Sequence, residues 1–155
     1  MGEIGKSFHQ INAVIEDQHA DHQSTIVEIE GTISNQKLSI LIDLEATLSY
    51  ITPKMMENCQ LTKVRHARPW SIQLATVSKR KVTEFIANCE ISIQDHVTRI
   101  NLNVFPLGSY DMIIGMDWLE RYKVVLNCFD KTFTYVVEDK IFREVRGLSK
   151  PIYLR

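Results

Sequence analysis

The sequence predicts an all-β domain, either a barrel or a sandwich, and three observations support this. Short runs rich in Ile, Val, Leu, Phe and Thr recur along the chain, and turn signals separate them at intervals of roughly eight to twelve residues. Only two segments, both short, have helical spacing. With 155 residues, 45% hydrophobic and 24% charged, the chain has the length and composition of one globular domain with its own core.

The first strands are expected from Thr25 onward, after a polar segment, residues 1–23, that we interpret as an N-terminal tether. Apolar and polar residues alternate from 26 to 33, a polar turn follows at 34–36, and an apolar run then leads to Asp43. This pattern predicts a hairpin whose second strand ends at Asp43. Further on, Thr52 can cap a short helix that begins at Pro53.

The second half of the chain continues the pattern of short strands. They are expected around residues 71–75, 81–87, 90–93 and 100–104, and a buried strand at 111–114 precedes a turn at Gly115 and a short helix at 117–122. Residues 124–126 and 132–137 should pair with each other. The domain is therefore expected to span residues 24–145, with residues 146–155 as a linker towards a downstream domain.

Charge and hydropathy exclude two classes of partner. The net charge of -1 provides no field to hold a phosphate backbone, and the basic run 79–81 is too short to change this, so we expect no direct nucleic-acid binding. No apolar stretch approaches the roughly 20 residues that span a bilayer, and no signal peptide pattern is present. We expect a soluble intracellular protein without membrane contact.

Cysteine and histidine spacing predicts neither disulfides nor metal. Cys59, Cys89 and Cys128 are widely separated and lack a Cys-x-x-Cys pair, so we expect three buried, reduced thiols. His19 and His22 have no third ligand at a useful spacing and are interpreted as surface residues. No metal and no cofactor are expected.

Several motifs carry more specific information through their order along the chain. The motif segments are Leu41–Asp43, Ala46–Ile51, Gln73–Thr76, Pro106–Asp111 and Ile113–Leu119. In this order they resemble the retropepsins, the aspartic proteases of retroviral type, in the version found in gypsy-class LTR retrotransposons of plants. The resemblance runs from about Thr25 to Lys140.

The resemblance implies a closed retropepsin-like barrel that forms half of a dimeric aspartic protease. Peptide hydrolysis of this kind needs two carboxylates that share a proton, and a domain this short supplies one, Asp43. The resemblance therefore implies a homodimer with an Asp43/Asp43 dyad and a peptide or polyprotein substrate. It places the substrate cleft at Ala46, Thr47, Thr76 and Val77, and a structural motif at Ile113, Ile114 and Gly115.

The residues near the second motif are interpreted as structural. Asp111 and Asp117 are also carboxylates, but their flanks match structural segments of the family, and Asp117 is expected to stabilise the start of the helix after Gly115. Trp118 and Leu119 are expected to anchor that helix in the core. Gly115 is expected at a position that a Cβ would crowd.

The chain departs from the family at two functional positions. Retropepsins have Ser or Thr and then Gly after the aspartate, whereas this chain has Leu44 and Glu45. Leu44 cannot make the hydrogen bonds that the hydroxyl makes across the dimer, and Glu45 should either splay the loop or raise the proton affinity of the dyad. Val77 stands where the flap of relatives usually has a glycine near its turn. We therefore expect protease activity that is weakened or lost.

Three functions remain open at this point. The first is an aspartic endopeptidase, active or degenerate, that processes its own Gag-Pol polyprotein in the cytoplasm or in virus-like particles. The second is a non-catalytic dimerisation or peptide-binding module on the same fold. The third is a β-barrel unrelated to proteases, which would be a monomer without a dyad.

Overall fold

The computed structural model describes residues 26–73, 79–94, 96–137 and 141–148. The tether (1–23) and the flap residues Thr76 and Val77 lie outside this part of the chain. The described elements are β1 (Ile26–Ile33), β2 (Gln36–Asp43), β3 (Tyr50–Ile51), α1 (Pro53–Asn58), β4 (Val64–Gln73), β5 (Lys79–Ile93), β6 (His96–Val104), β7 (Met112–Ile114), α2 (Met116–Arg121), β8 (Val125–Asn127), β9 (Thr132–Val137) and β10 (Ile141–Arg146).

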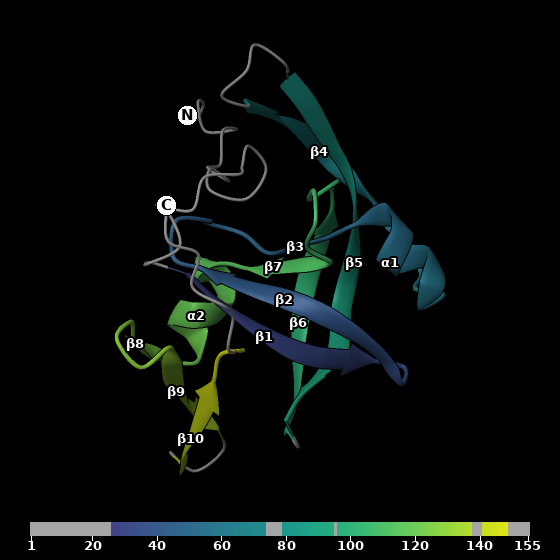
Figure 1. Ribbon diagram of the computed structural model, residues 1–155. Coiled ribbons are helices and arrows are strands. Elements are labelled where there is room, and N and C mark those ends of the chain that lie inside the picture. The colour runs from purple at the N-terminus through teal and green to yellow at the C-terminus, as the bar shows by residue number, and fades with distance from the viewer. Residues whose placement is uncertain (1–25, 74–78, 95, 138–140, 149–155) are drawn as a thin grey trace.

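Six strands close into a barrel. They are hydrogen-bonded in the order β1, β2, β7, β3, β6 and β5, and β5 pairs with β1 again through Gly31–Ile93 and Thr32–Ser92. β4 continues the sheet beyond β5, and β8, β9 and β10 form a separate small sheet. Figure 1 shows α1 and α2 flanking the barrel and the small sheet beside α2. The predicted fold class, a closed barrel with two short helices, is confirmed.

The hairpin that leads to Asp43 forms as predicted. β1 pairs with β2 from Ile33–Gln36 at the turn to Ile26–Asp43 at the far end. Ser34 and Asn35 connect the strands with φ angles of 51° and 66°. A two-residue turn with both φ angles positive matches the twist of the flanking strands and fixes their register. Asp43 is therefore placed at the end of β2 by the register of its own hairpin.

Both predicted helices are present, with slightly different bounds. Thr52 accepts a hydrogen bond from the Met55 amide at 3.2 Å and caps α1, which begins at Pro53. α2 buries Trp118 and Leu119, as expected, and the Trp118 indole donates to Thr98 Oγ1 at 3.0 Å. Neither helix in the described ranges is long and apolar enough to cross a bilayer.

The β4–β5 hairpin is longer than predicted. β4 begins at Val64, although only residues 71–75 were expected to be extended, and β5 is one strand where two were predicted. The pairing of β5 with β6 shifts register between Ile86 and Cys89, and Asn88 between them has a φ of 50°. This bulge interrupts the alternation of side chains without ending the strand, which explains the wrong division.

β10 was not predicted, and it extends the folded part to residue 148. Val145 of β10 is only 2% exposed and packs in the main core, whereas its neighbours Glu144 and Arg146 are exposed. Beyond the strand, the Gly147 amide donates to Lys131 O at 2.6 Å and the Leu148 amide donates to Glu28 O at 2.7 Å. The first three residues of the expected linker, 146–148, are thus bound to the domain.

The barrel wall separates two clusters of buried side chains. The first, main cluster includes Ile40, Ile42, Ile114, Trp118 and Val145. The second cluster consists of Leu41, Ala46, Tyr50, Ile72, Val82, Phe105, Leu107 and Ile113, with Leu48, Trp70 and Tyr110 packed against it. Adjacent residues of β2 and of β7 point to different clusters because side chains alternate along a strand.

The cysteines differ from expectation in one case. Cys59 and Cys89 are buried free thiols, as predicted, but Cys128 is exposed. Cys128 follows the short strand β8 in the turn before β9. Sequence spacing could not distinguish this turn residue from a core residue.

Candidate active site

Asp43 is buried at the end of β2 on the side of the second cluster. Ile40 and Ile42 belong to the first cluster and Leu41 to the second, so the alternation of the strand places Asp43 on the face of Leu41. The side chain is 0% exposed. A fully buried carboxylate at the end of a barrel strand is costly in solvation, and such groups commonly serve a function.

The two oxygens of this carboxylate have different surroundings. Oδ1 accepts a hydrogen bond from the Glu45 amide at 2.9 Å, whereas Oδ2 is buried without a hydrogen-bond partner among the described residues. Burial raises the pKa of Asp43, the hydrogen bond from the Glu45 amide lowers it, and the charge of Glu45 raises it again. The net effect is a raised pKa, which favours a carboxyl group that keeps its proton.

The loop after Asp43 is fixed by the start of α2. The Ala46 amide closes a turn onto Asp43 O at 3.2 Å. The Met116 amide then donates to Ala46 O at 2.8 Å, and the Asp117 amide donates to Thr47 O at 3.2 Å. Of the two described cleft candidates, Ala46 is fully buried and Thr47 is exposed.

Gly115 makes this close approach possible. A Cβ at this position would lie 2.3 Å from Leu48 O and 2.6 Å from Ala46 O. Because both neighbours are backbone atoms, they cannot move aside as a flexible side chain could. The predicted role of Gly115 is confirmed, and the reason is contact between two segments that are distant in sequence.

Ser49 and Asp117 form a second connection between the loop and α2. Ser49 Oγ donates to Asp117 Oδ1 at 2.6 Å, the Ser49 amide donates to Oδ2 at 3.2 Å, and the Gly115 amide donates to Ser49 Oγ at 3.0 Å. Asp117 also accepts from the Trp118 amide at 2.8 Å. Loss of hydration raises the pKa of Asp117 although the Ser49 hydroxyl lowers it. Asp117 thus stabilises the start of α2, as expected, and it also holds Ser49.

Two polar residues that support the loop, Asn103 and His66, were not identified from the sequence. Asn103 of β6 is buried, and its side chain donates to Ser49 O at 3.2 Å. Its Oδ1 lies 2.8 Å from His66 Nε2, and the His66 ring stacks on Phe85 with centroids 4.5 Å apart. No local signal in the sequence could have paired His66 with Asn103.

Asp111 lies outside this cluster and has a structural role. Its Oδ2 accepts from the Ser39 amide at 2.8 Å, and its carbonyl accepts from the Thr52 amide at 3.0 Å. The hydrogen bonds of Asp111 therefore connect β2 to the start of α1. This agrees with the interpretation that Asp111 is not the catalytic carboxylate.

The two unusual residues after Asp43 are both accommodated. Leu44 is 40% exposed, Glu45 is exposed, and neither has a positive φ. The loop therefore does not need glycine for its backbone conformation, and the Glu45 amide still reaches Asp43. The Ala46 amide still closes the turn onto Asp43 O, and the charge of Glu45 is one of the causes that raise the pKa of Asp43 within this chain. The expected effect on a dyad stays a prediction.

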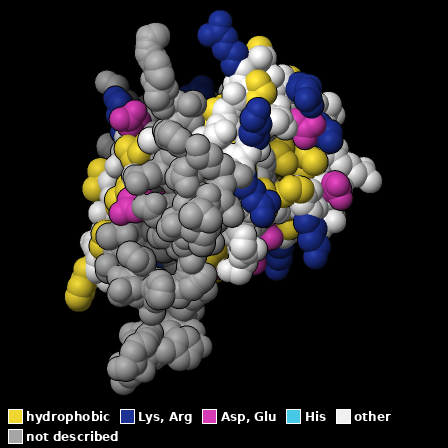
Figure 2. All heavy atoms as spheres, turned by 90° about the horizontal axis from the view of Figure 1, so that it is seen from above, with side chains coloured by type: hydrophobic (Ala, Val, Ile, Leu, Met, Phe, Trp, Pro, Cys, Tyr) yellow, Lys and Arg dark blue, Asp and Glu magenta, His cyan; other side chains and the backbone are white. Residues whose placement is uncertain are grey.

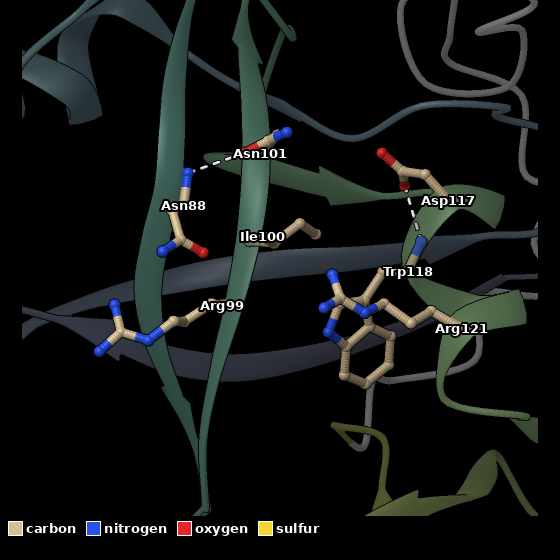
Figure 3. Close-up of a pocket in the computed structure, with 7 residues that line it drawn as sticks. All are labelled: Asn88, Arg99, Ile100, Asn101, Asp117, Trp118 and Arg121. Atoms are coloured by element: carbon tan, nitrogen blue, oxygen red, sulfur yellow. Dashed lines mark hydrogen bonds between the residues drawn. The ribbon is translucent and has the colours of Figure 1, made fainter.

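A hollow of about 280 Å³ lies elsewhere on the barrel (Figure 3). Its lining residues come from β5, β6 and α2: Asn88, Arg99, Ile100, Asn101, Asp117, Trp118 and Arg121. Neither Asp43 nor its loop contributes to it. Within the described residues, no group of three His, Cys, Asp or Glu side chains is arranged to hold a metal ion.

A closed barrel with one buried carboxylate of raised pKa beside a glycine-dependent contact has the features expected of a retropepsin-like domain. The sequence profile described as retroviral aspartyl protease matches residues 8–140. This chain belongs to the retroviral aspartyl protease family.

A solved structure agrees at the level of the fold. The crystal structure of the retroviral protease-like domain of Ddi1 from Leishmania major is 18% identical, with a TM-score of 0.61 over 81% of this chain and 95% of that one. A protein of unknown function from Legionella pneumophila, Lpg0085, is 13% identical, with a TM-score of 0.39 over 61% of this chain and 84% of that one. No curated protein matched the sequence.

Proposed function

We propose that this domain is an aspartic endopeptidase that acts as a homodimer, with Asp43 of each protomer forming the catalytic dyad. The observation that carries the proposal is the state of the Asp43 carboxylate. One oxygen is held by the Glu45 amide, and the other is buried and unpartnered among the described residues. A second carboxyl group that shares a proton would supply the missing partner, and each protomer could provide it to the other.

The dyad would hydrolyse a peptide bond by general acid and base catalysis. The ionised Asp43 takes a proton from water as the oxygen attacks the peptide carbonyl, and the protonated Asp43 donates its proton to the carbonyl oxygen. As the C–N bond breaks, the amine takes the proton from the Asp43 that received it from water. The other Asp43 takes a proton from a hydroxyl of the intermediate, which becomes the carboxylic acid product, and the dyad is restored. The raised pKa of Asp43 supports this scheme because one of the two carboxyl groups must remain protonated.

Leu44 and Glu45 should make this catalyst slow. Leu44 removes the hydroxyl that relatives place beside the aspartate, and an unmade buried hydrogen bond costs about 1–3 kcal/mol. Glu45 adds one negative charge per protomer next to the dyad, which further opposes ionisation of Asp43. We expect a weak dimer with low turnover at neutral pH.

The test is cleavage of a broad peptide library by the purified protein at acidic and neutral pH. Asp43→Asn should abolish cleavage, and the pair Leu44→Ser with Glu45→Gly should raise it at least about tenfold, since the pair restores the hydroxyl and removes the charge. Cleavage that persists in Asp43→Asn would show that another group catalyses the reaction.

A non-catalytic dimerisation or peptide-binding module is the second candidate. Leu44, which is 40% exposed beside Asp43, favours it because this leucine offers apolar contact where relatives have a polar group. The triple change Leu44→Ser, Glu45→Gly and Val77→Gly separates the two functions. Recovered cleavage identifies a weakened protease, whereas a continued lack of cleavage with retained peptide binding identifies a binding module.

We further propose that the domain derives from a gypsy-class retrotransposon polyprotein, which it would process in the cytoplasm or in virus-like particles. The order of the motifs in the sequence supports this origin, and membership of the retroviral aspartyl protease family is consistent with it. Reverse transcriptase sequence in the same reading frame would establish it. A reading frame without Gag or polymerase sequence would contradict it.

A further inference from the structure

The β4–β5 hairpin has an inner face that can be identified from its register. Trp70 pairs with Val82, and Ile72 pairs with Arg80, without a register shift between the two pairs. Residues that face each other across an antiparallel pair point to the same side of the sheet. Arg80 therefore lies on the same side as Ile72 and Val82, which are both fully buried.

This inner face belongs to the surroundings of Asp43. Ile72 and Val82 pack in the second cluster together with Leu41 and Ala46. Asp43 lies on the Leu41 face of β2, and Ala46 is in the turn that Asp43 begins. Asp43 on β2 and Arg80 on β5 thus flank the same apolar cluster. A peptide bound at Asp43 against this face would pass near Arg80.

Positive charge is concentrated on this hairpin although the whole chain is nearly neutral. Between residues 63 and 86 the described side chains include one carboxylate, Glu84, and five Lys or Arg: Lys63, Arg65, Arg68, Arg80 and Lys81. Figure 2 looks onto this end of the molecule, and several Lys and Arg side chains gather on the right of the view. The net charge of the chain is -1.

Among the described residues, Arg80 has no carboxylate partner and, unlike the equally unpaired Lys81, it lies on the inner face. Lys63 and Arg65 approach Glu84 at 3.5 Å and 4.0 Å, whereas Arg80 is exposed and makes no ion pair with any described residue. A guanidinium group presents a planar pair of donors that fits a carboxylate better than any neutral side chain does. We propose that Arg80 selects an acidic side chain, Asp or Glu, in the peptide that binds at the Asp43 site.

The proposal rests on the proposed function for the place where the peptide binds, but its test does not require cleavage. Fluorescent peptides of about eight residues with an apolar centre, differing only in Asp, Ala or Lys beside that centre, would be titrated into the Asp43→Asn protein. Fluorescence anisotropy gives the affinity of each. We expect the Asp peptide to bind roughly five- to tenfold more tightly than the Ala peptide, and the Lys peptide to bind weakest.

Lys81 provides a matched control. It is adjacent to Arg80 and exposed, but it pairs with Ser71, so it lies on the other side of the hairpin. Arg80→Glu and Lys81→Glu change the net charge equally. Arg80→Glu should reverse the order so that the Lys peptide binds best, whereas Lys81→Glu should preserve the preference for Asp.

Three outcomes would overturn the proposal. If Arg80→Glu and Lys81→Glu changed the peptide preference equally, the preference would come from the overall charge of the hairpin. If Arg80→Glu weakened the binding of all three peptides equally, Arg80 would have a structural role. Equal binding of all three peptides by the Asp43→Asn protein would exclude selection altogether. Binding with the expected preference but no cleavage by the unmodified protein would contradict the proposed protease function and support the role of Arg80. Cleavage by the unmodified protein without any preference among the peptides would support the protease function and contradict the role of Arg80.

Discussion

Gly115 occupies a place where two backbone carbonyls leave no room for a side chain. A Cβ would approach Leu48 O to 2.3 Å, a contact closer than real Cβ atoms show, so Gly115→Ala must push the Asp43 loop away from α2. We expect a loss of about 3 kcal/mol in the free energy of unfolding. Urea unfolding followed by circular dichroism measures it. The control is Ser109→Ala at an exposed turn, which should change stability by less than about 0.5 kcal/mol. A similarly small change for Gly115→Ala would show that the Asp43 loop is free to move.

Asp43 should make stability depend on pH in an unusual direction. Its pKa in the folded state is raised above the unfolded value, so its contribution to stability is fully present below the unfolded pKa and is lost as pH rises through the folded pKa. Asp43→Asn cannot ionise. The variant should therefore be more stable than the parent at pH 7, with a smaller difference at pH 3.

The measurement is urea unfolding of both proteins at the two pH values. Asp117 also has a raised pKa, but it is present in both proteins and cancels in the comparison. The opposite result would be a variant that is less stable than the parent at pH 7, with a smaller difference at pH 3. It would show that ionised Asp43 is favourably paired.

At the scale of elements, Asn103 connects two strands and the loop that follows Asp43. Its side chain joins Ser49, before β3, to His66 of β4, and it is buried on β6. Asn103→Ala leaves the Ser49 carbonyl with one hydrogen-bond donor fewer and deprives His66 of its partner. We expect a loss of about 1–3 kcal/mol in stability.

Asn101 on the same strand serves as the control for Asn103. It is exposed and accepts from the Asn88 amide at 2.7 Å. Asn101→Ala should cost less than about 1 kcal/mol, because water can replace an exposed partner. Equal losses at both positions, measured by urea unfolding, would contradict the assigned role of Asn103.

β10 is expected to be part of the stable domain. Val145 is 2% exposed and packs in the first cluster, so Val145→Ala removes two buried carbon atoms and should cost about 2 kcal/mol. Glu144→Ala, at the neighbouring exposed position, should have almost no effect. Thermal unfolding of the two variants checks this, and a harmless Val145→Ala would mean that the domain ends before β10.

At the scale of the whole molecule, the proposed site is complete only in a dimer. Cleavage per milligram should therefore rise with protein concentration until dimers predominate. Excess Asp43→Asn protein, mixed with the unmodified protein, should suppress activity because mixed dimers contain one carboxylate. Activity that is independent of concentration and unaffected by the mixture would show that one chain suffices.

The sequence by itself determined the class of fold and the position of the candidate carboxylate. Alternating apolar residues, the turn at Ser34 and Asn35, and the cap at Thr52 are local signals, and they predicted the first hairpin and α1 correctly. Local rules failed at β5, where a bulge breaks the alternation of side chains. They also failed at β10, because one fully buried residue among those described, Val145, is too weak a signal to predict a strand.

Only the tertiary structure decided what surrounds Asp43. Ser49, Asn103 and Asp117 meet because strands distant in sequence pair in the barrel, and such contacts leave no local pattern. The structure also decided that Glu45 fits without a positive φ and still supplies its amide to Asp43. Local sequence signals determine much of the local conformation, whereas the state of a carboxylate depends on groups that the folded chain brings together.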